Sequence, residues 1–363
     1  MQRALKLLQT TPGLLVLIAL LRSAGFAFGV LNIDESDYMV FGASILRGEI
    51  PYRDLGEVKP PLGYYTWVPA GLFGGMQAWP MRVVGVLWIL ATALLLRDAV
   101  RRWAKDELAG TCAAVLSILA TLCEVPSLGN EAMMNLPAAA ALWCFVRART
   151  SPSRSLASRL FELLAGAAVG VASLYKLQAG IEGAALGIAA IAGAILYRYN
   201  AEIVPVHVSN GGPSAPSFPA RLTEGALRGA LLSIGFVLPW AIAMGAYAAI
   251  GEWSSYVDWV FTRSFAYAGQ GATGGGLGRF AQSTLLCVGA TIVPWTLAAR
   301  GSWAAIKSKL ADPIALAGVL FVWLTWLPVS AGGRFYEHYY LQFAPALALV
   351  GAPWAADLVR RFV

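Results

Sequence analysis

Long apolar runs recur along the whole chain and are separated by shorter polar segments. The runs have about 18 to 20 residues, the length that an α-helix needs to cross the hydrocarbon core of a bilayer. They predict ten transmembrane helices. The predicted spans cover residues 13–31, 81–97, 108–125, 131–147, 161–175, 179–197, 226–249, 282–299, 314–330 and 339–357. The pattern therefore predicts an all-α, polytopic helical bundle embedded in a membrane.

The composition agrees with this pattern. Of the 363 residues, 58% are hydrophobic and 13% are charged, against roughly 45–50% and about 25% in soluble domains. This excludes a soluble enzyme, a disordered chain and a nucleic-acid-binding domain. The four cysteines lie inside apolar runs without C-x-x-C spacing, which argues against a disulfide framework or a zinc site. The first apolar run is too long for the core of a cleavable signal peptide, so it is predicted as the first transmembrane helix.

Basic residues predict the orientation. They gather in every second loop, and the cytoplasmic loops of membrane proteins carry an excess of Lys and Arg. The residues concerned are Arg97, Arg101, Arg102, Lys105, Arg147, Arg149, Arg154, Arg159, Arg198, Arg221, Arg228, Arg300, Lys307, Lys309, Arg360 and Arg361. We therefore expect these loops and both termini in the cytoplasm. The net charge of +7 then reflects membrane orientation rather than nucleic-acid binding.

The other loops hold polar residues that the orientation does not require. Residues 31–80 form the predicted first outer loop, which is rich in acidic groups. Charged groups near membrane depth are costly and usually mark a functional cavity. We treat residues 1–363 as one transmembrane domain, with a cytoplasmic linker at 199–225 and an outer gating loop at 250–281. Apolar stripes predict interfacial helices in the first and fourth outer loops.

Four motifs lie in the outer loops. They read N-I-D-E-S-D-Y at 32–38, R-G-E-I-P-Y-R-D at 47–54, E-V-K-P-P-L-G-Y-Y at 57–65 and G-G-R-F-Y-E-H-Y-Y-L at 332–341. Their order, spacing and common side resemble the GT-C superfamily of membrane glycosyltransferases, in the branch of bacterial aminoarabinose transferases and protein O-mannosyltransferases. The resemblance implies a polyprenyl-phosphate sugar as donor, transfer on the outer side, and a bacterial-type inner membrane.

Asp34 and Glu35 are the predicted catalytic residues. A carboxylate at the mouth of a helical bundle can accept the proton of an attacking hydroxyl if it lies within hydrogen-bond reach. The resemblance assigns this role to Asp34, with Glu35 orienting it. The alternative is a solvated acidic loop beside a helix end.

Lys59 is the first predicted ligand of the donor phosphate. Pro60 and Pro61 restrict the backbone that follows it, and an ammonium forms charge-assisted hydrogen bonds with phosphate oxygens. The resemblance implies the same role. The alternative is a lysine that only extends its charge to the membrane interface.

Arg334 and His338 complete the predicted phosphate site. They would be neighbours on one helix face if the last helix begins early, and a guanidinium binds phosphate in a bidentate manner. The alternative for Arg334 is a surface pair with Glu337. Further possible substrate-binding residues are Glu57, Tyr64, Glu131, Lys176 and Glu337.

No cofactor is certain from the sequence. Asp34, Glu35 and Asp37 could bind a divalent cation through oxygen ligands, and the metal requirement stays open. The segment G-A-T-G-G-G-L-G at 271–278 lacks the G-K-[ST] ending of a phosphate-binding loop and is expected to be a mobile part of the outer gating loop.

The predicted function is transfer of a sugar from a polyprenyl-phosphate donor to a lipid, glycan or protein acceptor, with inversion at the anomeric carbon. The expected partners are the donor, the acceptor and membrane lipids, and no nucleic acid. Two alternatives remain. A transporter or flippase of a lipid-linked or anionic substrate would place its site near the bilayer midplane, and a scaffold protein could retain the fold without activity.

Overall fold

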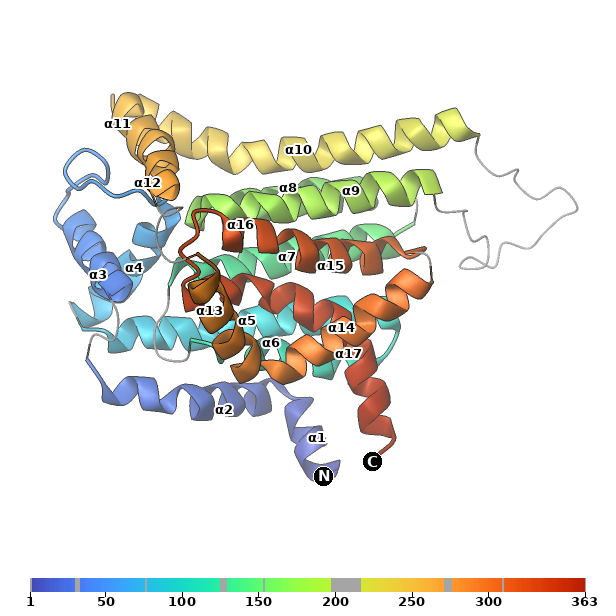
Figure 1. Cartoon of the computed structure of the whole chain (residues 1–363). Helices are drawn as coiled ribbons and strands as arrows, with labels where there is room; N and C mark the ends of the chain where they lie inside the picture. Colours follow the sequence, from blue (N-terminus) through green and yellow to red (C-terminus); the bar gives the residue numbers. More distant parts are fainter. Residues whose placement is uncertain are drawn as a thin grey trace, which may run out of the picture.

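The computed structural model describes residues 2–29, 33–75, 77–124, 129–152, 154–196, 217–270, 276–308 and 310–362. Within these residues every regular element is a helix, and one isolated bridge joins Pro51 to Leu55. Long, roughly parallel helices form a bundle, and the two termini lie near each other, away from α3 and α4 (Figure 1). The predicted all-α class is confirmed.

The first half of the described chain contains α1 (Gln2–Leu8), α2 (Thr11–Arg22), η1 (Ser23–Ala27), α3 (Ile33–Leu46), α4 (Leu62–Gly74), α5 (Trp79–Ala104), α6 (Glu107–Leu119), α7 (Asn130–Thr150), α8 (Leu156–Tyr175), η2 (Leu177–Ala179) and α9 (Gly180–Leu196). The second half contains α10 (Phe218–Ala249), α11 (Trp253–Val257), η4 (Asp258–Arg263), α12 (Ser264–Gln270), α13 (Gly276–Ala290), α14 (Ile292–Lys307), α15 (Pro313–Leu324), α16 (Trp326–Ser330), η6 (Glu337–Phe343) and α17 (Ala344–Arg360).

Six helical stretches among the described residues are long and apolar enough to cross a membrane, and a bent pair would make a seventh. Two further apolar helices, Thr11–Ala27 and Glu107–Leu119, are shorter. The chain is therefore an integral membrane protein. The count of ten spans stays a prediction, although each predicted range overlaps at least one helix of the described residues.

The predicted span 282–299 is not one straight helix. It falls on α13 and α14, which meet at an angle of 93°. Thr291 leaves the helical conformation at the break, with φ −121° and ψ 32°. Pro294 follows in the first turn of α14, where it lacks the N–H that a continuous helix would need.

Parts of the predicted loops can be placed. Residues 199–216 of the predicted linker and residues 271–275 of the predicted gating loop lie outside the described residues. The end of the predicted linker, from Phe218, forms the first turns of α10. α3 and α4 lie in the predicted first outer loop, and α11, η4 and α12 in the fourth. Their interfacial position stays a prediction.

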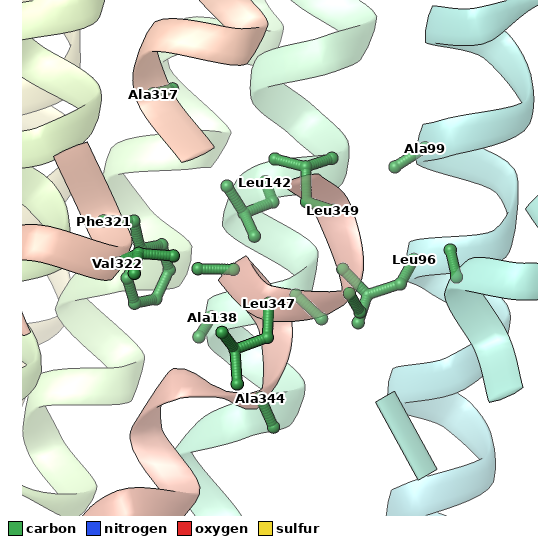
Figure 2. Close-up of a cluster of buried hydrophobic side chains, with 14 of the residues drawn as sticks. Leu96, Ala99, Ala138, Leu142, Ala317, Phe321, Val322, Ala344, Leu347 and Leu349 are labelled. Atoms are coloured by element: carbon green, nitrogen blue, oxygen red, sulfur yellow. The ribbon is translucent and has the colours of Figure 1, made fainter. Parts of the chain in front are cut away.

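The main core surrounds α17. Leu347 and Leu349 of this helix are buried among Leu96 of α5, Leu142 of α7 and Phe321 of α15 (Figure 2). Many of the other core residues are alanines. Small side chains let helices approach closely, which matters in a membrane because lipid tails are as apolar as the helices themselves.

Glycines allow the close crossing of α8 and α10. Gly166 and Gly170, a G-x-x-x-G pair on α8, face the α10 backbone, and a Cβ at Gly166 would overlap the carbonyl of Leu232. Gly235 of α10 faces the α8 backbone in return. α10 is otherwise mostly exposed and apolar, with Ile242 at 72% exposure, as expected for a helix that contacts lipid.

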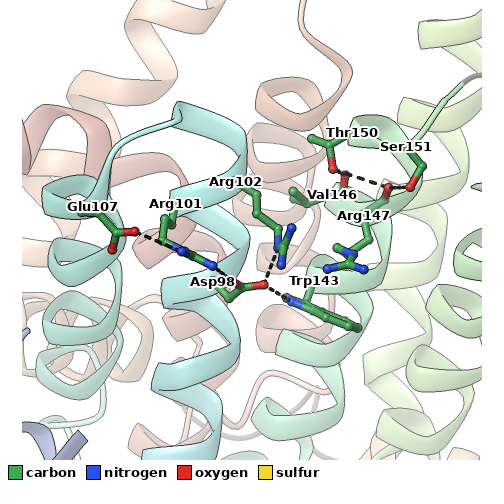
Figure 3. Close-up of polar contacts among 9 residues, drawn as sticks. All are labelled: Asp98, Arg101, Arg102, Glu107, Trp143, Val146, Arg147, Thr150 and Ser151. Atoms are coloured by element: carbon green, nitrogen blue, oxygen red, sulfur yellow. Dashed lines mark hydrogen bonds and ion pairs between the residues drawn. The ribbon is translucent and has the colours of Figure 1, made fainter. Parts of the chain in front are cut away.

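The bundle has two polar ends, which we call the motif end and the basic end. The motif end contains α3, α4, the start of α7 and η6; the basic end contains residues 98–107 and 147–154. At the basic end, Asp98 accepts hydrogen bonds from Arg101, Arg102 and Trp143, at 2.5, 2.6 and 2.8 Å (Figure 3). These contacts join the end of α5 to α7.

Candidate active site

The predicted acidic pair opens α3. Asp34 and Glu35 both lie in its first turn. Consecutive residues of a helix point in directions about 100° apart, so the two carboxylates take different partners. Asp34 is partly exposed, whereas Glu35 is 1% exposed.

Asp34 forms an ion pair with Lys59. The Lys59 Nζ lies 2.8 Å from Asp34 Oδ1, and the two side chains are 26% and 27% exposed. The ammonium also lies 4.9 Å above the ring of Tyr38. Burial by itself would lower the pKa of Lys59, but the Asp34 carboxylate outweighs that effect and raises the pKa above its ordinary value. Lys59 therefore stays charged beside a carboxylate.

The Lys-Pro-Pro segment holds this cation in place. The Tyr52 hydroxyl donates a 2.6 Å hydrogen bond to the Lys59 carbonyl. Pro61 is the N-cap of α4, with φ −71°. Lys59 is thus fixed by a tyrosine on its own carbonyl and by a restricted backbone immediately after it.

Glu35 forms a buried ion pair with Arg82 of α5. Its two carboxylate oxygens lie 3.1 and 3.3 Å from Arg82 Nη2 and Nε. Arg82 is 5% exposed and also donates to the carbonyls of Gly25, Phe28 and Gly29. The pair connects α3, α5 and the segment after η1. Arg82 was not among the predicted site residues, although an arginine inside a predicted span is a recognised signal.

Glu131 and Lys176 form a further ion pair at the motif end. Glu131 lies in the first turn of α7, and Lys176 lies between α8 and η2. His338 Nε2 of η6 is 3.6 Å from Glu131 Oε1, and Lys176 Nζ lies 3.7 Å above the ring of Tyr339. Three distant segments therefore meet here, and the charge of Glu131 also acts on Lys59.

Arg334 and Glu337 contact residues other than Lys59. The Arg334 guanidinium lies 3.9 Å above the ring of Tyr267 and donates to its carbonyl at 3.3 Å. Glu337 accepts a 3.4 Å hydrogen bond from Ser283. The last helical segment begins only at Glu337, so Arg334 and His338 are not neighbours on one helix face. Phe335, with φ +47°, separates them.

The remaining candidates lie close to Lys59. Glu57 accepts a 2.8 Å hydrogen bond from the N–H of Val58, so it shapes the local turn. Tyr64 is fully buried and stacks on Phe41, with ring centroids 4.1 Å apart.

Burial raises the pKa of Asp37 above its ordinary value. The acid groups do not converge: in the described part of the chain, no cluster of three or more His, Cys, Asp or Glu side chains could hold a metal ion.

Comparison with known sequences gives one family. The profile of the dolichyl-phosphate-mannose-protein mannosyltransferases matches residues 58–207, a segment that contains Lys59, Glu131 and Lys176. No curated protein matches the chain.

Comparison with solved structures covers nearly the whole chain. ArnT from Cupriavidus metallidurans, crystallised with undecaprenyl phosphate, superposes with a TM-score of 0.65 over 96% of this chain at 17% identity. The chain has a GT-C fold. It resembles the mannosyltransferase and ArnT branch of that superfamily, as its motifs predicted.

A second GT-C structure supports the same fold. The oligosaccharyltransferase AglB from Archaeoglobus fulgidus, in complex with an inhibitory peptide and a dolichol-phosphate, superposes with a TM-score of 0.55 over 97% of this chain at 13% identity. The chain spans 62% of the length of ArnT and 51% of the length of AglB. The shared GT-C fold thus corresponds to only part of each of these longer proteins.

Proposed function

We propose that this protein is a membrane glycosyltransferase that takes a hexose or pentose from a polyprenyl-phosphate donor. It passes the sugar to a lipid, glycan or protein acceptor on the outer face of a bacterial-type inner membrane. The fold shared with ArnT and the mannosyltransferase profile support the class of reaction. The site residues support its chemistry.

The Lys59–Asp34 ion pair carries the proposal. It places a fixed ammonium and a carboxylate 2.8 Å apart, partly exposed, at one end of an apolar bundle. An anionic donor competes with Asp34 for Lys59, because a phosphate oxygen forms the same charge-assisted hydrogen bond. Donor binding therefore frees the carboxylate that the acceptor needs.

The transfer follows from these positions. The acceptor hydroxyl attacks the anomeric carbon and gives its proton to Asp34, and the bond from that carbon to the phosphate oxygen breaks. The polyprenyl phosphate leaves with its new negative charge beside Lys59, which stabilises it. Attack in line with the leaving group inverts the anomeric carbon.

The other candidates take supporting roles. Glu35, held by Arg82, fixes the start of α3 and thereby positions Asp34. His338 contributes to the phosphate site from η6, next to the Glu131–Lys176 pair. Arg334 supplies a further phosphate contact once its guanidinium leaves the ring of Tyr267.

The test is a transfer assay. Purified protein in lipid nanodiscs is incubated with radiolabelled polyprenyl-phosphate mannose, glucose, arabinose or aminoarabinose, together with a membrane extract as acceptor source. We expect release of polyprenyl phosphate with at least one donor. Movement of intact donor across a proteoliposome membrane, without release, would favour the transporter.

The proposed side of the membrane makes a separate prediction. A cysteine introduced at Arg53, in the first outer loop, should react with an impermeant maleimide in intact cells. A cysteine at Ala157, at the basic end, should react only after the cells are opened. Both positions are exposed, and the background lacks the four native cysteines. The reverse pattern would place the site on the cytoplasmic side.

A further inference from the structure

Three buried polar side chains beside Lys59 have unused hydrogen-bonding capacity. Tyr38, Tyr64 and Asn130 are 1%, 0% and 2% exposed. The two hydroxyls and both amide atoms of Asn130 have no hydrogen-bond partner among the described residues. Buried polar groups are nearly always hydrogen-bonded, so three such side chains together need an explanation.

The three side chains lie together. The rings of Tyr38 and Tyr64 are 6.0 Å apart. The backbone N–H of Asn130 lies close to the Tyr38 hydroxyl, and that of Lys59 lies close to the Tyr64 hydroxyl, but neither contact has the geometry of a regular hydrogen bond. The Asn130 amide rests against Gly63, where a Cβ would overlap its oxygen. Gly63 of the Lys-Pro-Pro-Leu-Gly motif therefore leaves the space that this amide occupies.

These groups lie directly beneath the charged residues of the site. Lys59 covers the ring of Tyr38. The charges of Asp34 and Glu131 both act on Tyr38, and the charges of Glu57, Asp37 and Asp34 act on Tyr64. We call Tyr38, Tyr64 and Asn130 the polar floor of the site.

We propose that the polar floor binds the ring hydroxyls of a neutral donor sugar. This inference rests on the proposed function. When the donor phosphate draws Lys59 away from Asp34, the ammonium also moves off Tyr38 and opens the floor beneath it. An amide both donates and accepts hydrogen bonds, and each tyrosine hydroxyl does the same, which suits the vicinal hydroxyls of a hexose or pentose. The three groups carry no charge, so they match the uncharged hydroxyls of a neutral sugar.

The floor is tested by comparing two probes on the full chain in nanodiscs. One probe is decaprenyl phosphate. The other is decaprenyl-phosphate mannose, glucose or arabinose, whichever of these three the wild type binds most tightly. The wild type should prefer the glycosylated probe. Tyr38→Phe and Tyr64→Phe should each reduce that preference about 3- to 10-fold, and Asn130→Ala about 10-fold or more.

Tyr256→Phe is the matched control. Its hydroxyl is also buried without a partner, but its ring packs on Tyr247 and Tyr52, away from the charged groups. This variant should keep the wild-type preference. The three floor variants should melt at or above the wild-type temperature, because each substitution removes a buried group that has no hydrogen-bond partner in the described part of the chain.

The outcomes separate the two proposals. A wild type that binds neither probe would contradict the proposed function itself. A wild type that binds decaprenyl phosphate without preferring the sugar would overturn the floor alone. Tyr→Phe variants that keep the full preference would also overturn it and would mean that water satisfies these hydroxyls. If Asn130→Ala does not fold, the two Tyr→Phe variants decide.

Discussion

At the basic end of the bundle, Arg101 and Arg102 pair with Asp98 three and four positions earlier in the same helix. At the motif end, Lys59 pairs with Asp34 across 25 positions, and Lys176 with Glu131 across 45. Pairs within one helix stabilise the end of that helix. Pairs between distant segments hold the segments together, and a ligand of the right charge can compete for them.

Burial sharpens this difference. Arg101 and Arg102 are 41% and 37% exposed, whereas Glu35 and Arg82 are 0% and 4% exposed in their side chains. Exposed pairs contribute little to stability, typically about 0–1 kcal/mol. A buried charge that loses its partner is costly. The basic end also holds a buried pair between helices, Arg149 with Glu162, so the contrast applies to the Asp98 cluster alone. Substitutions in the Lys59–Asp34 and Arg82–Glu35 pairs should therefore change function or folding, and matched substitutions in the Asp98 cluster should change neither by much.

The largest effect is expected for Asp34→Asn. The amide keeps the size of the carboxylate but cannot take the acceptor proton, so turnover should fall by about 10²–10⁴-fold. Binding of the donor should persist. The matched control is Asp98→Asn at the basic end, which should keep nearly full turnover. Near-normal turnover of Asp34→Asn on a hydroxyl acceptor would exclude Asp34 as the base.

The next effect concerns stability. Arg82→Leu leaves the buried Glu35 without its arginine and should destabilise the protein by about 3–5 kcal/mol. Arg102→Leu should cost about 1 kcal/mol or less. Thermal unfolding in detergent compares the two variants. Arg82→Leu combined with Glu35→Leu should recover part of the loss, because no unpaired charge then remains buried. An Arg82→Leu variant as stable as the wild type would show that the Glu35–Arg82 pair does not stabilise the fold.

Lys59→Ala should weaken donor binding. The expected loss is about 1.5–3 kcal/mol, the contribution of a hydrogen bond to a charged group, and thermal stability should change much less. Affinity is measured by titration of decaprenyl phosphate into the protein in nanodiscs. Arg102→Ala, which removes a cation at the basic end, serves as the control. Equal affinities of wild type and Lys59→Ala would exclude this lysine from the phosphate site.

The smallest effect is a flat pH profile. The pKa of Lys59 lies above its ordinary value of 10.5 because Asp34 faces it. Stabilisation from a raised lysine pKa is complete below the unfolded value and is lost only as the pH rises through the folded value. The contribution of Lys59 to binding of a polyprenyl-phosphate sugar, a diester that carries one charge, should therefore stay constant between about pH 6 and 9, measured as the ratio of the affinities of wild type and Lys59→Ala. A change of this ratio within the range would show that Lys59 does not hold its charge as the ion pair requires.

The amino-acid sequence predicted the class of fold and singled out several of the charged residues that meet at the motif end. The free energy of placing a segment in lipid depends mainly on the residues of that segment, so apolar runs can be identified from the sequence alone. Asp34 and Lys59 stood out for the same reason, because charges beside apolar runs are costly unless they have a function. The structure places these two residues in direct contact.

The tertiary structure decided which groups meet. Arg82 pairs with Glu35, which lies 47 positions away in the sequence. His338 of η6, near the other end of the chain, contacts Glu131. Neither contact leaves a local pattern, because helix packing rather than sequence spacing brings them together. The sharp bend at Thr291 and the separation of Arg334 from His338 depend on single backbone conformations. Hydropathy averages over such positions. The sequence therefore specifies the helical class and the charged residues of the loops, whereas the packing of the bundle sets which of these residues pair with each other.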